Sequence, residues 1–216
     1  MWTSQEKTNQ HNYELIESPC ELILDLEQIK KHLNDLPACD GSEDVYLTKV
    51  ANAAISYAEK ITELDLATKT YRLYLDHFGS HHHHHNNCIN IFKRRNVEIL
   101  SVEFLLDGEL QTVDNNNYFV TFSNDYPQLC LVDDFCFPDH DNRKQAIQIK
   151  FKAGFGDKSC NIPSDLCQAI FEHIAQMFTN RGDCEECDCD GNLPSNTKMI
   201  YQAYKPLTLT TCQYNF

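Results

Sequence analysis

The sequence has no apolar run that approaches the roughly 18–20 residues needed to cross a membrane. Its polar N-terminus, MWTSQEKTNQHNYE, lacks the apolar segment of a signal peptide, so we expect the chain to stay in the compartment where it is made. Basic residues are also few, because 18 lysines and arginines stand against 32 acidic residues and the formal net charge is −14. A protein of that charge repels nucleic acid, which argues against a conventional DNA- or RNA-binding module.

Motifs of the common catalytic classes are missing as well. The sequence has no nucleophile elbow, phosphate loop, metalloprotease helix or dinucleotide fingerprint. Gly154-Phe155-Gly156 lacks both the third glycine of the fingerprint and the lysine-serine pair of the phosphate loop. His173 recurs in step with apolar residues, which favours a core or interface histidine over a general base. We therefore expect no enzyme, no catalytic residue and no cofactor.

Cysteine, by contrast, is abundant. The chain has 11 cysteines, an odd number, and most of them stand singly among apolar residues. A free cysteine behaves as a small buried hydrophobe, and a chain without a secretory signal keeps its thiols reduced. We expect most of the cysteines to be reduced core thiols, including Cys130, Cys136, Cys160 and Cys167.

Two short runs could hold a metal ion. Cys184, Cys187 and Cys189 place three thiols within six residues, but a structural zinc site needs four ligands and no second Cys-x-x-Cys follows. The five histidines at 81–85 could bind transition metals, as any histidine tract can. Solvated loops are the preferred interpretation of both runs, and of the acidic loop at 133–143. We therefore expect no metal site.

Hydrophobic periodicity predicts helices first, then a run of short strands, then helices again. Elements segregated in this way indicate an α+β fold with N-terminal helices, a central run of short antiparallel strands and a long C-terminal amphipathic helix. The expected helices lie at residues 26–36, 43–64, 163–182 and 197–204. The expected strands lie at 68–78, 88–92, 97–106, 118–122, 128–132 and 147–152, with a hairpin at Asp107-Gly108.

The most informative stretch runs from residue 144 to residue 182. Ile147, Ile149 and Phe151 alternate with polar residues, so this strand has one buried face and one wet face that carries Lys150 and Lys152. Two glycines then end the strand, and Pro163 opens a helix. The apolar stripe of that helix consists of Leu166, Ala169, Ile170, His173, Ile174, Met177 and Phe178.

Four segments, in order, resemble one known family. They are residues 25–33 (DLEQIKKHL), 53–62 (AAISYAEKIT), 149–156 (IKFKAGFG) and 162–170 (IPSDLCQAI), the last followed by Asn180-Arg181. The resemblance is to the head–tail connector, or adaptor, proteins of long-tailed bacteriophages and related particles, and it spans roughly residues 22–205. The histidine run at 81–85 and the cysteine run at 184–189 are insertions outside the family's pattern.

The resemblance implies a structural head-completion protein that forms a ring of about twelve copies beneath the portal. Such a ring extends the DNA channel and joins the head to the tail. The implied partners are the portal protein, neighbouring copies, the tail or the next head-completion protein, and packaged DNA passing without sequence-specific binding; no membrane is involved. The implied location is the head–tail junction of the virion, after synthesis in the host cytoplasm. A tail-terminator or other tail-completion ring protein, and a small metal-binding protein built on residues 184–189, stay open as alternatives.

The polar composition of the first 20 residues, together with the resemblance in the residues after them, gives an expected division of the chain. We expect an N-terminal arm over 1–20, a connector core over 21–182 with a β-rich insertion around 68–153, and a cysteine-rich loop and docking tail over 183–216. Lys150 and Lys152 are the candidates for a ring-contact or lumen face. The candidates for portal docking are the apolar and aromatic residues Met199, Ile200, Tyr201, Tyr204, Leu207, Leu209, Tyr214 and Phe216.

Overall fold

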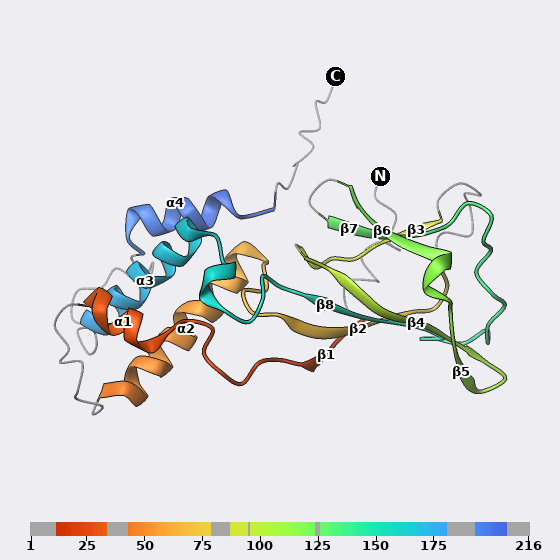
Figure 1. The fold of residues 1–216 in the computed structure, drawn as a ribbon, viewed down its shortest axis with the longest axis horizontal. Coiled ribbons are helices and arrows are strands. Elements are labelled where there is room, and N and C mark those ends of the chain that lie inside the picture. Colours follow the sequence, from red (N-terminus) through yellow and green to blue (C-terminus); the bar gives the residue numbers. More distant parts are fainter. Residues whose placement is uncertain are drawn as a thin grey trace, which may run out of the picture. The chain divides into compact units, whose positions relative to one another are not determined.

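The computed structural model of the chain describes residues 12–33, 43–78, 87–94, 96–123, 126–180 and 193–206. The chain divides into two compact units, each built from two separate stretches of sequence. The β unit comprises Met1–Ile23 and Leu64–Asn161, and the helical unit comprises Leu24–Glu63 and Ile162–Phe216. All strands lie in the first unit and all α-helices in the second, which confirms the predicted α+β class (Figure 1).

Four α-helices make up the described part of the helical unit. They are α1 (Leu26–Leu33), α2 (Asp44–Thr62), α3 (Ser164–Thr179) and α4 (Ser195–Ala203). The other three all contact α3. Ala51, Ala54 and Ala58 of α2 are fully buried, and such small side chains let a neighbouring helix approach closely. Among the described residues, no helix is long and apolar enough to cross a membrane.

The stripe predicted around Ile170 is the buried face of α3. Pro163 precedes the helix, where its missing N–H costs no helical hydrogen bond. Ile170 and Ile174 are fully buried, and His173 lies between them on the same buried face. The predicted core stripe is therefore confirmed for these residues.

The expectation of a long C-terminal helix needs a correction. The last described helix is α4, which has only nine residues, whereas the amphipathic helix α3 has 16 residues and precedes it. Pro194 stands at the N-cap of α4, and Pro206 comes two residues after its C-cap, Tyr204. A proline disfavours helical backbone in the residues before it, so α4 does not extend back through Pro194 and does not continue into Pro206.

Two antiparallel sheets make up the β unit. The five-stranded sheet has the order β1-β2-β8-β4-β5, and the three-stranded sheet has the order β3-β7-β6. The strands are β1 (Tyr13–Glu17), β2 (Lys69–Leu75), β3 (Cys88–Asn90), β4 (Glu98–Leu106), β5 (Glu109–Thr112), β6 (Tyr118–Ser123), β7 (Tyr126–Leu131) and β8 (Ile147–Ala153). All neighbouring strands in these sheets run antiparallel, as the sequence predicts.

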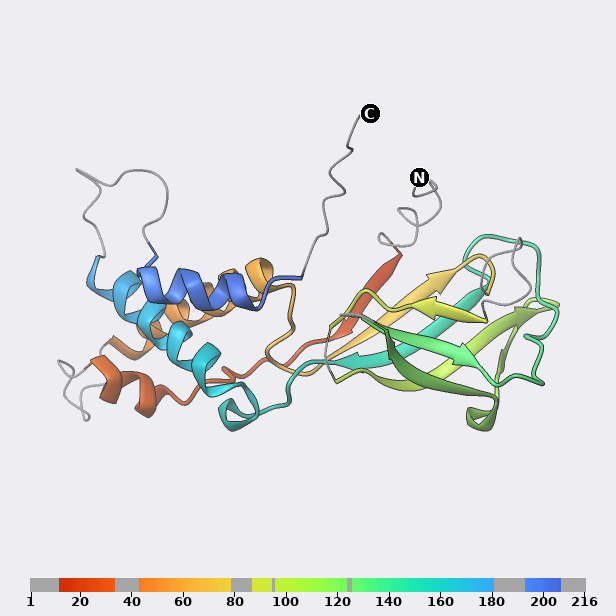
Figure 2. The ribbon, with the colours of Figure 1, turned by 90° about the horizontal axis from the view of Figure 1, so that it is seen from above.

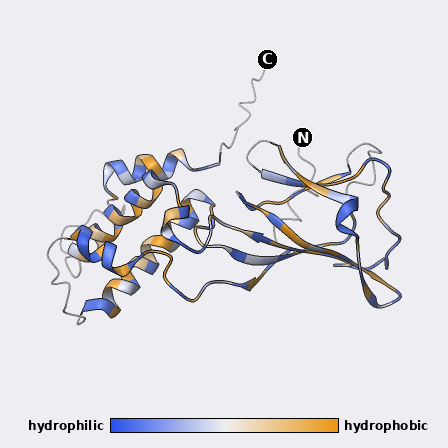
Figure 3. Ribbon diagram, viewed as in Figure 1, coloured by the Kyte–Doolittle hydropathy of each residue, from blue (hydrophilic) through white to orange (hydrophobic). Residues whose placement is uncertain are grey.

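The core of the β unit lies between its two sheets. Ile147, Ile149 and Phe151 of β8 are fully buried and alternate with partly exposed polar residues. Ile89 of β3 and Leu129 of β7 belong to the same buried cluster. The three-stranded sheet overlies the five-stranded sheet (Figure 2), and hydrophobic and hydrophilic positions alternate along the strands (Figure 3). The alternation along β8 therefore gives the central strand of the larger sheet one buried face and one face that is partly exposed to solvent.

Two glycine-containing turns shape the five-stranded sheet. Asp107 and Gly108 both adopt positive φ, as a tight hairpin between β4 and β5 requires, and the Asp141 carboxylate accepts hydrogen bonds from both of their N–H groups. Gly154 adopts φ +136°, and a Cβ at this position would lie 2.4 Å from the carbonyl oxygen of Ala67. Only glycine therefore permits the close approach of these two backbone segments.

The N-terminal arm expected over residues 1–20 is partly a strand instead. Tyr13–Glu17 forms β1, an edge strand that pairs with β2 and places Tyr13 opposite Leu73. A five-residue strand inside a polar stretch gives too little alternation to be recognised from sequence. Residues 1–11 lie outside the described part, and the division of the chain at residues 20 and 182 stays a prediction.

The expectation of reduced core thiols also needs a correction. Cys130 forms a disulfide with Cys88, because antiparallel pairing of β3 and β7 brings the two residues opposite each other. Cys136 and Cys160 are exposed free thiols, and Cys167 is half-buried. Burial raises the pKa of the Cys167 thiol, which keeps it protonated.

Candidate assembly interfaces

The polar face of the five-stranded sheet carries the predicted basic pair. Lys150 and Lys152 lie on the central strand β8, and both side chains are partly exposed. Antiparallel pairing places Arg72 of β2 opposite Lys150, and Glu98 of β4 opposite Lys152. The pairing of β2 with β8 thus adds a third cation to the two that the sequence identifies.

Carboxylates border these cations on the same face. Glu14 of the edge strand β1 stands opposite Arg72, and Glu103 of β4 stands opposite Gln148 of β8. The Tyr74 hydroxyl donates to Glu14 Oε2 at 2.6 Å, and Arg72 Nη1 donates to the Tyr74 oxygen at 3.3 Å. The bond to Tyr74, with help from Glu14 and Glu103, raises the pKa of Arg72 against the opposing effect of desolvation. The Arg72 guanidinium is therefore engaged by side chains of its own chain.

Lys150 and Lys152 differ from Arg72 in this respect. Within the described residues, neither ammonium group forms an ion pair with a carboxylate. Two residues apart on one strand, they project from the same face about 7 Å apart. Because glutamates surround them, this face is mixed in charge, which suits a complementary protein surface better than a phosphate backbone.

The described part of the predicted docking segment lies on and just after α4. Met199 is 69% exposed, whereas Tyr201 is 1% exposed and belongs to the unit's own core. Ile200 and Tyr204 are partly exposed, and the Tyr204 hydroxyl donates to Asp165 of α3 at 2.7 Å. Docking by the exposed members of this set stays a prediction. The remaining candidates, Leu207, Leu209, Tyr214 and Phe216, lie outside the described residues.

An aromatic cluster fixes α4 to α3 and α2. The Tyr201 hydroxyl lies 3.4 Å from His173 Nδ1, and the Tyr57 ring packs edge-on against His173 with centroids 5.1 Å apart. Burial lowers the pKa of His173 and raises the pKa of Tyr201, so both groups are neutral near pH 7. His173 is thus a buried histidine in an aromatic setting.

The acidic loop and the metal candidates add no reactive site to the described residues. In this part of the chain, no group of three or more histidine, cysteine, aspartate or glutamate side chains could hold a metal ion. Asp141 caps the β4–β5 turn, while Asp133 and Asp134 are exposed. The cysteine run at 184–189 and the histidines at 81–85 lie outside the described residues.

The outer edge of the three-stranded sheet is a feature that the sequence did not predict. Strand β6 pairs only with β7 among the described strands. Leu131 N donates to Asn87 O, and Ile91 N donates to Pro127 O, so the main-chain groups of Pro127 and Leu131 in β7 point toward β3. The main-chain groups of the alternate β7 residues point toward β6. By the same alternation, the main-chain groups of Tyr118, Val120 and Phe122 point away from β7.

Within the described part of the chain, strand β6 shows neither the sequence features nor the irregular pairing that usually protect an edge strand. Its sequence, YFVTFS, contains no charge and no proline, and its register with β7 is continuous. Phe119 is 50% exposed and Phe122 is 63% exposed. This combination is typical of a strand that pairs with another chain. An uncharged β-branched and aromatic run is the signal in the sequence that could have identified it.

The fold is shared with solved structures of particle necks. A chain in a structure described as the neck of an empty GTA particle computed with C6 symmetry is similar with a TM-score of 0.73 and 18% identity. A chain in a virion of a native gene transfer agent (GTA) particle gives 0.72 and 18%, and one in a neck of a native GTA particle computed with C12 symmetry gives 0.68 and 16%. Each match covers 92% of this chain and 97% of the other. No protein-family model and no curated protein sequence matches the chain.

Proposed function

We propose that this chain is a structural head-completion protein that forms a ring beneath the portal of a phage-like particle. The observation that carries the proposal is the fold, which matches chains from GTA necks over nearly the whole of both chains. Four sequence segments independently resemble the head–tail connector family. In this role the chain catalyses no reaction and needs no cofactor.

A ring of about twelve copies agrees with the symmetry of the similar structures. The neck structures that contain similar chains were computed with C12 and with C6 symmetry, and a ring of twelve copies is compatible with both. Head-to-tail contacts between identical chains close into such a ring when the rotation between neighbours is constant. The ring extends the DNA channel and connects the portal to the tail or to the next head-completion protein.

The charge of the chain supports a channel through which DNA slides. With a net charge of −14, the ring repels the phosphate backbone instead of holding it. Lys150 and Lys152 serve as ring contacts in this proposal, since their mixed-charge surroundings favour a protein partner. The exposed side chains of the C-terminal segment, Met199 among them, dock on the portal, while the buried Tyr201 anchors α4 to its own unit.

The location and copy number of the chain in purified particles test the proposal. Cryo-EM of particles, with protein quantification against the portal, should show a closed ring between the portal and the tail with about one copy per portal subunit. A ring at the far end of the tail tube would favour the tail-terminator alternative. Scattered copies on the capsid surface would sink the proposal, and stoichiometric zinc in the purified chain would favour the metal-binding alternative.

A further inference from the structure

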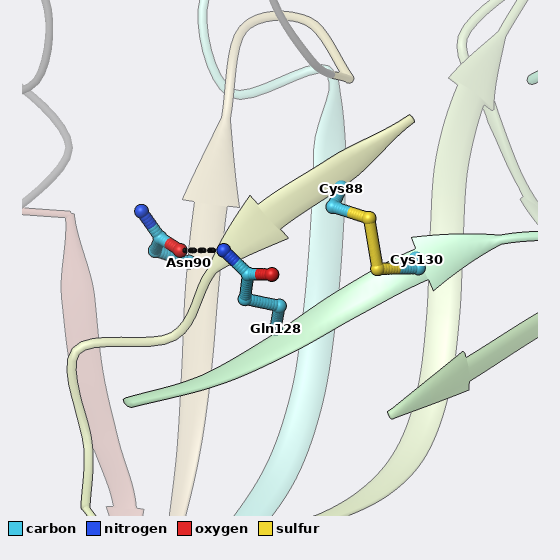
Figure 4. The surroundings of a disulfide bond; sticks show 4 residues. All are labelled: Cys88, Asn90, Gln128 and Cys130. Carbon is cyan, nitrogen blue, oxygen red and sulfur yellow. Dashed lines mark hydrogen bonds between the residues drawn. A yellow bond between two sulfur atoms is a disulfide. The ribbon is translucent and has the colours of Figure 1, made fainter. Parts of the chain in front are cut away.

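Cys88 and Cys130 stand directly opposite each other on adjacent strands. Cys88 is the first residue of β3 and Cys130 lies in β7, with their Cα atoms 4.0 Å apart and their sulfur atoms bonded (Figure 4). They are separated by 42 positions in sequence, so the bond links strands from distant parts of the chain. No other described cysteine shares a disulfide, since Cys20, Cys136, Cys160 and Cys167 are free.

The two strands are held together on both sides of this bond by other interactions. Leu131 N donates to Asn87 O at 2.9 Å, and Ile91 N donates to Pro127 O at 2.9 Å. On the same face as the sulfurs, Gln128 Nε2 donates to Asn90 Oδ1 at 2.7 Å (Figure 4).

The opposite face of β3 is held by the core, because Ile89 lies in the buried cluster of the β unit. Main-chain, side-chain and core contacts therefore keep the two cysteines in register whether or not the sulfurs are bonded. Oxidation and reduction of the pair require no refolding of the sheet.

We propose that Cys88 and Cys130 form a reversible redox site, a latch that closes β3 onto β7 under oxidising conditions. The oxidant is a low-molecular-weight disulfide of the glutathione class. The Cys88 thiolate attacks it first, because Cys88 is partly exposed whereas Cys130 is buried.

The first attack gives a mixed disulfide on Cys88 and releases one small thiol. The Cys130 thiolate then attacks the Cys88 sulfur, closes the protein disulfide and releases the second small thiol. Two protein thiols lose two electrons and two protons, and the small disulfide becomes two thiols. An excess of the small thiol drives the same steps in reverse.

The latch separates two states of the chain by compartment. In a reducing cytoplasm the pair is a dithiol, and outside the cell it is a disulfide. In the sequence, Cys88 precedes β4, β5 and β6, and Cys130 follows them. A disulfide between these two residues limits the conformational freedom of the unfolded chain. The timing rests on the proposed function: the chain assembles reduced, and its β unit becomes more stable once the particle leaves the host.

The test titrates the purified full-length chain in buffers of increasing glutathione disulfide. After an acid quench, free thiols are alkylated, disulfides are reduced, and the newly freed thiols are alkylated with a heavier reagent for mass spectrometry. In a sample mapped before the reduction step, Cys88 and Cys130 should appear as one cross-linked peptide pair with no glutathione attached, whereas the exposed Cys136 should be either free or bound to glutathione. The oxidised chain should melt at a temperature higher by roughly 4–16 °C than the reduced chain.

Matched variants identify the bond that causes this shift. Cys88→Ser and Cys130→Ser should each abolish it, and Cys136→Ser, at an exposed free thiol, should retain it. If a serine variant fails to fold, the wild-type chain in reductant serves as the dithiol state, and its far-UV spectrum should match that of the oxidised chain.

Two results would overturn the proposal: both thiols staying free in oxidising buffer, or Cys88 pairing with a different cysteine. The timing is tested separately, by rapid alkylation of host lysates and released particles. If the pair reacts reversibly in buffer but the chain is absent from purified particles, the proposed function is contradicted and the redox site is still supported.

Discussion

The two units of this chain differ in the groups that they leave for other chains to bind. In the helical unit, Glu172 accepts hydrogen bonds from Asn196 and Thr197, and Lys30 pairs with Asp44 at 2.7 Å. In the β unit, Lys150 and Lys152 pair with no carboxylate of the described chain.

The unpartnered groups of the β unit are what another chain could bind. Among the described residues, they include the two lysines and the outward main-chain groups of the edge strand β6. In this part of the chain, the helices bond their main-chain groups internally, whereas the β unit has open strand edges and therefore retains more capacity for contact through its backbone. One exception in the helical unit is the exposed side chain of Met199 on α4, which precedes the C-terminal segment in the sequence.

Removal of that segment should have the largest effect and tests the exception. A chain truncated after Lys205 keeps α4, whose Tyr201 packs on α3, so its melting transition should be unchanged. We expect it to fail completely to join portal-containing heads, as measured by co-sedimentation. Loss of folding instead would mean that the C-terminal segment belongs to the core of its own unit.

Ile174→Ala tests the self-sufficiency of the helical unit. Ile174 is fully buried on α3, so its truncation leaves a cavity and should cost about 2–5 kcal/mol of unfolding free energy. Urea denaturation measures this loss. Met199→Ala, at an exposed position on α4, is the matched control and should change stability by less than about 0.5 kcal/mol. Equal denaturation midpoints for the two variants would show that the α3 stripe is not core.

Charge reversal on the β unit tests its capacity for contact. Lys150→Glu with Lys152→Glu should leave the fold intact and reduce ring formation on portal-containing heads at least about tenfold, because like charges then meet across the subunit contact. Quantitative electron microscopy of neck occupancy measures this. The control reverses two exposed lysines off this face, Lys144 and Lys158, and should retain full occupancy. Unaltered occupancy in both variants would remove the lysine pair from the ring contact.

The smallest expected effect is a pH dependence from His173. Burial lowers the folded-state pKa of His173 below its ordinary value of 6.5. The unfolded chain then binds more protons between these two pKa values, so the unfolding free energy falls as pH drops below about 6.5. Urea midpoints at about pH 7.5 and about pH 5.5 measure this.

His173→Phe should remove part of the acid-induced loss, because the titrating group is gone while an aromatic ring remains. The control, His32→Phe, alters a half-buried histidine that stacks on Phe171, and should retain the loss. Identical pH responses in all three proteins would mean that the protonation of His173 is not linked to unfolding.

The two units also differ in how well the sequence predicts them. Each helix is a local pattern, so the stripe around Ile170 and the turn after Phe151 could be identified from neighbouring residues. The strand β8 was equally clear because it alternates over seven residues. What could not be predicted is non-local: the edge strand β1, the sheet order and the registers that determine which residues face one another.

The candidate interfaces follow the same rule. That Lys150 and Lys152 share one face is a local fact of strand geometry. That Glu98 and Arg72 flank them depends on pairing between strands far apart in sequence. The bond between Cys88 and Cys130 depends in the same way on the β3–β7 register, which neighbouring residues in the sequence do not reveal.

The open edge of β6 has a consequence for gene dosage. The uncharged strand YFVTFS, with Phe119 and Phe122 exposed, is prone to aggregation unless a partner covers its edge. Copies made in excess of the available assembly sites have no such cover, and edge-to-edge association rises with their concentration. We therefore expect the yield of soluble protein to fall when the chain is overproduced alone. The yield should recover when its neighbours in the particle are produced in matching amounts.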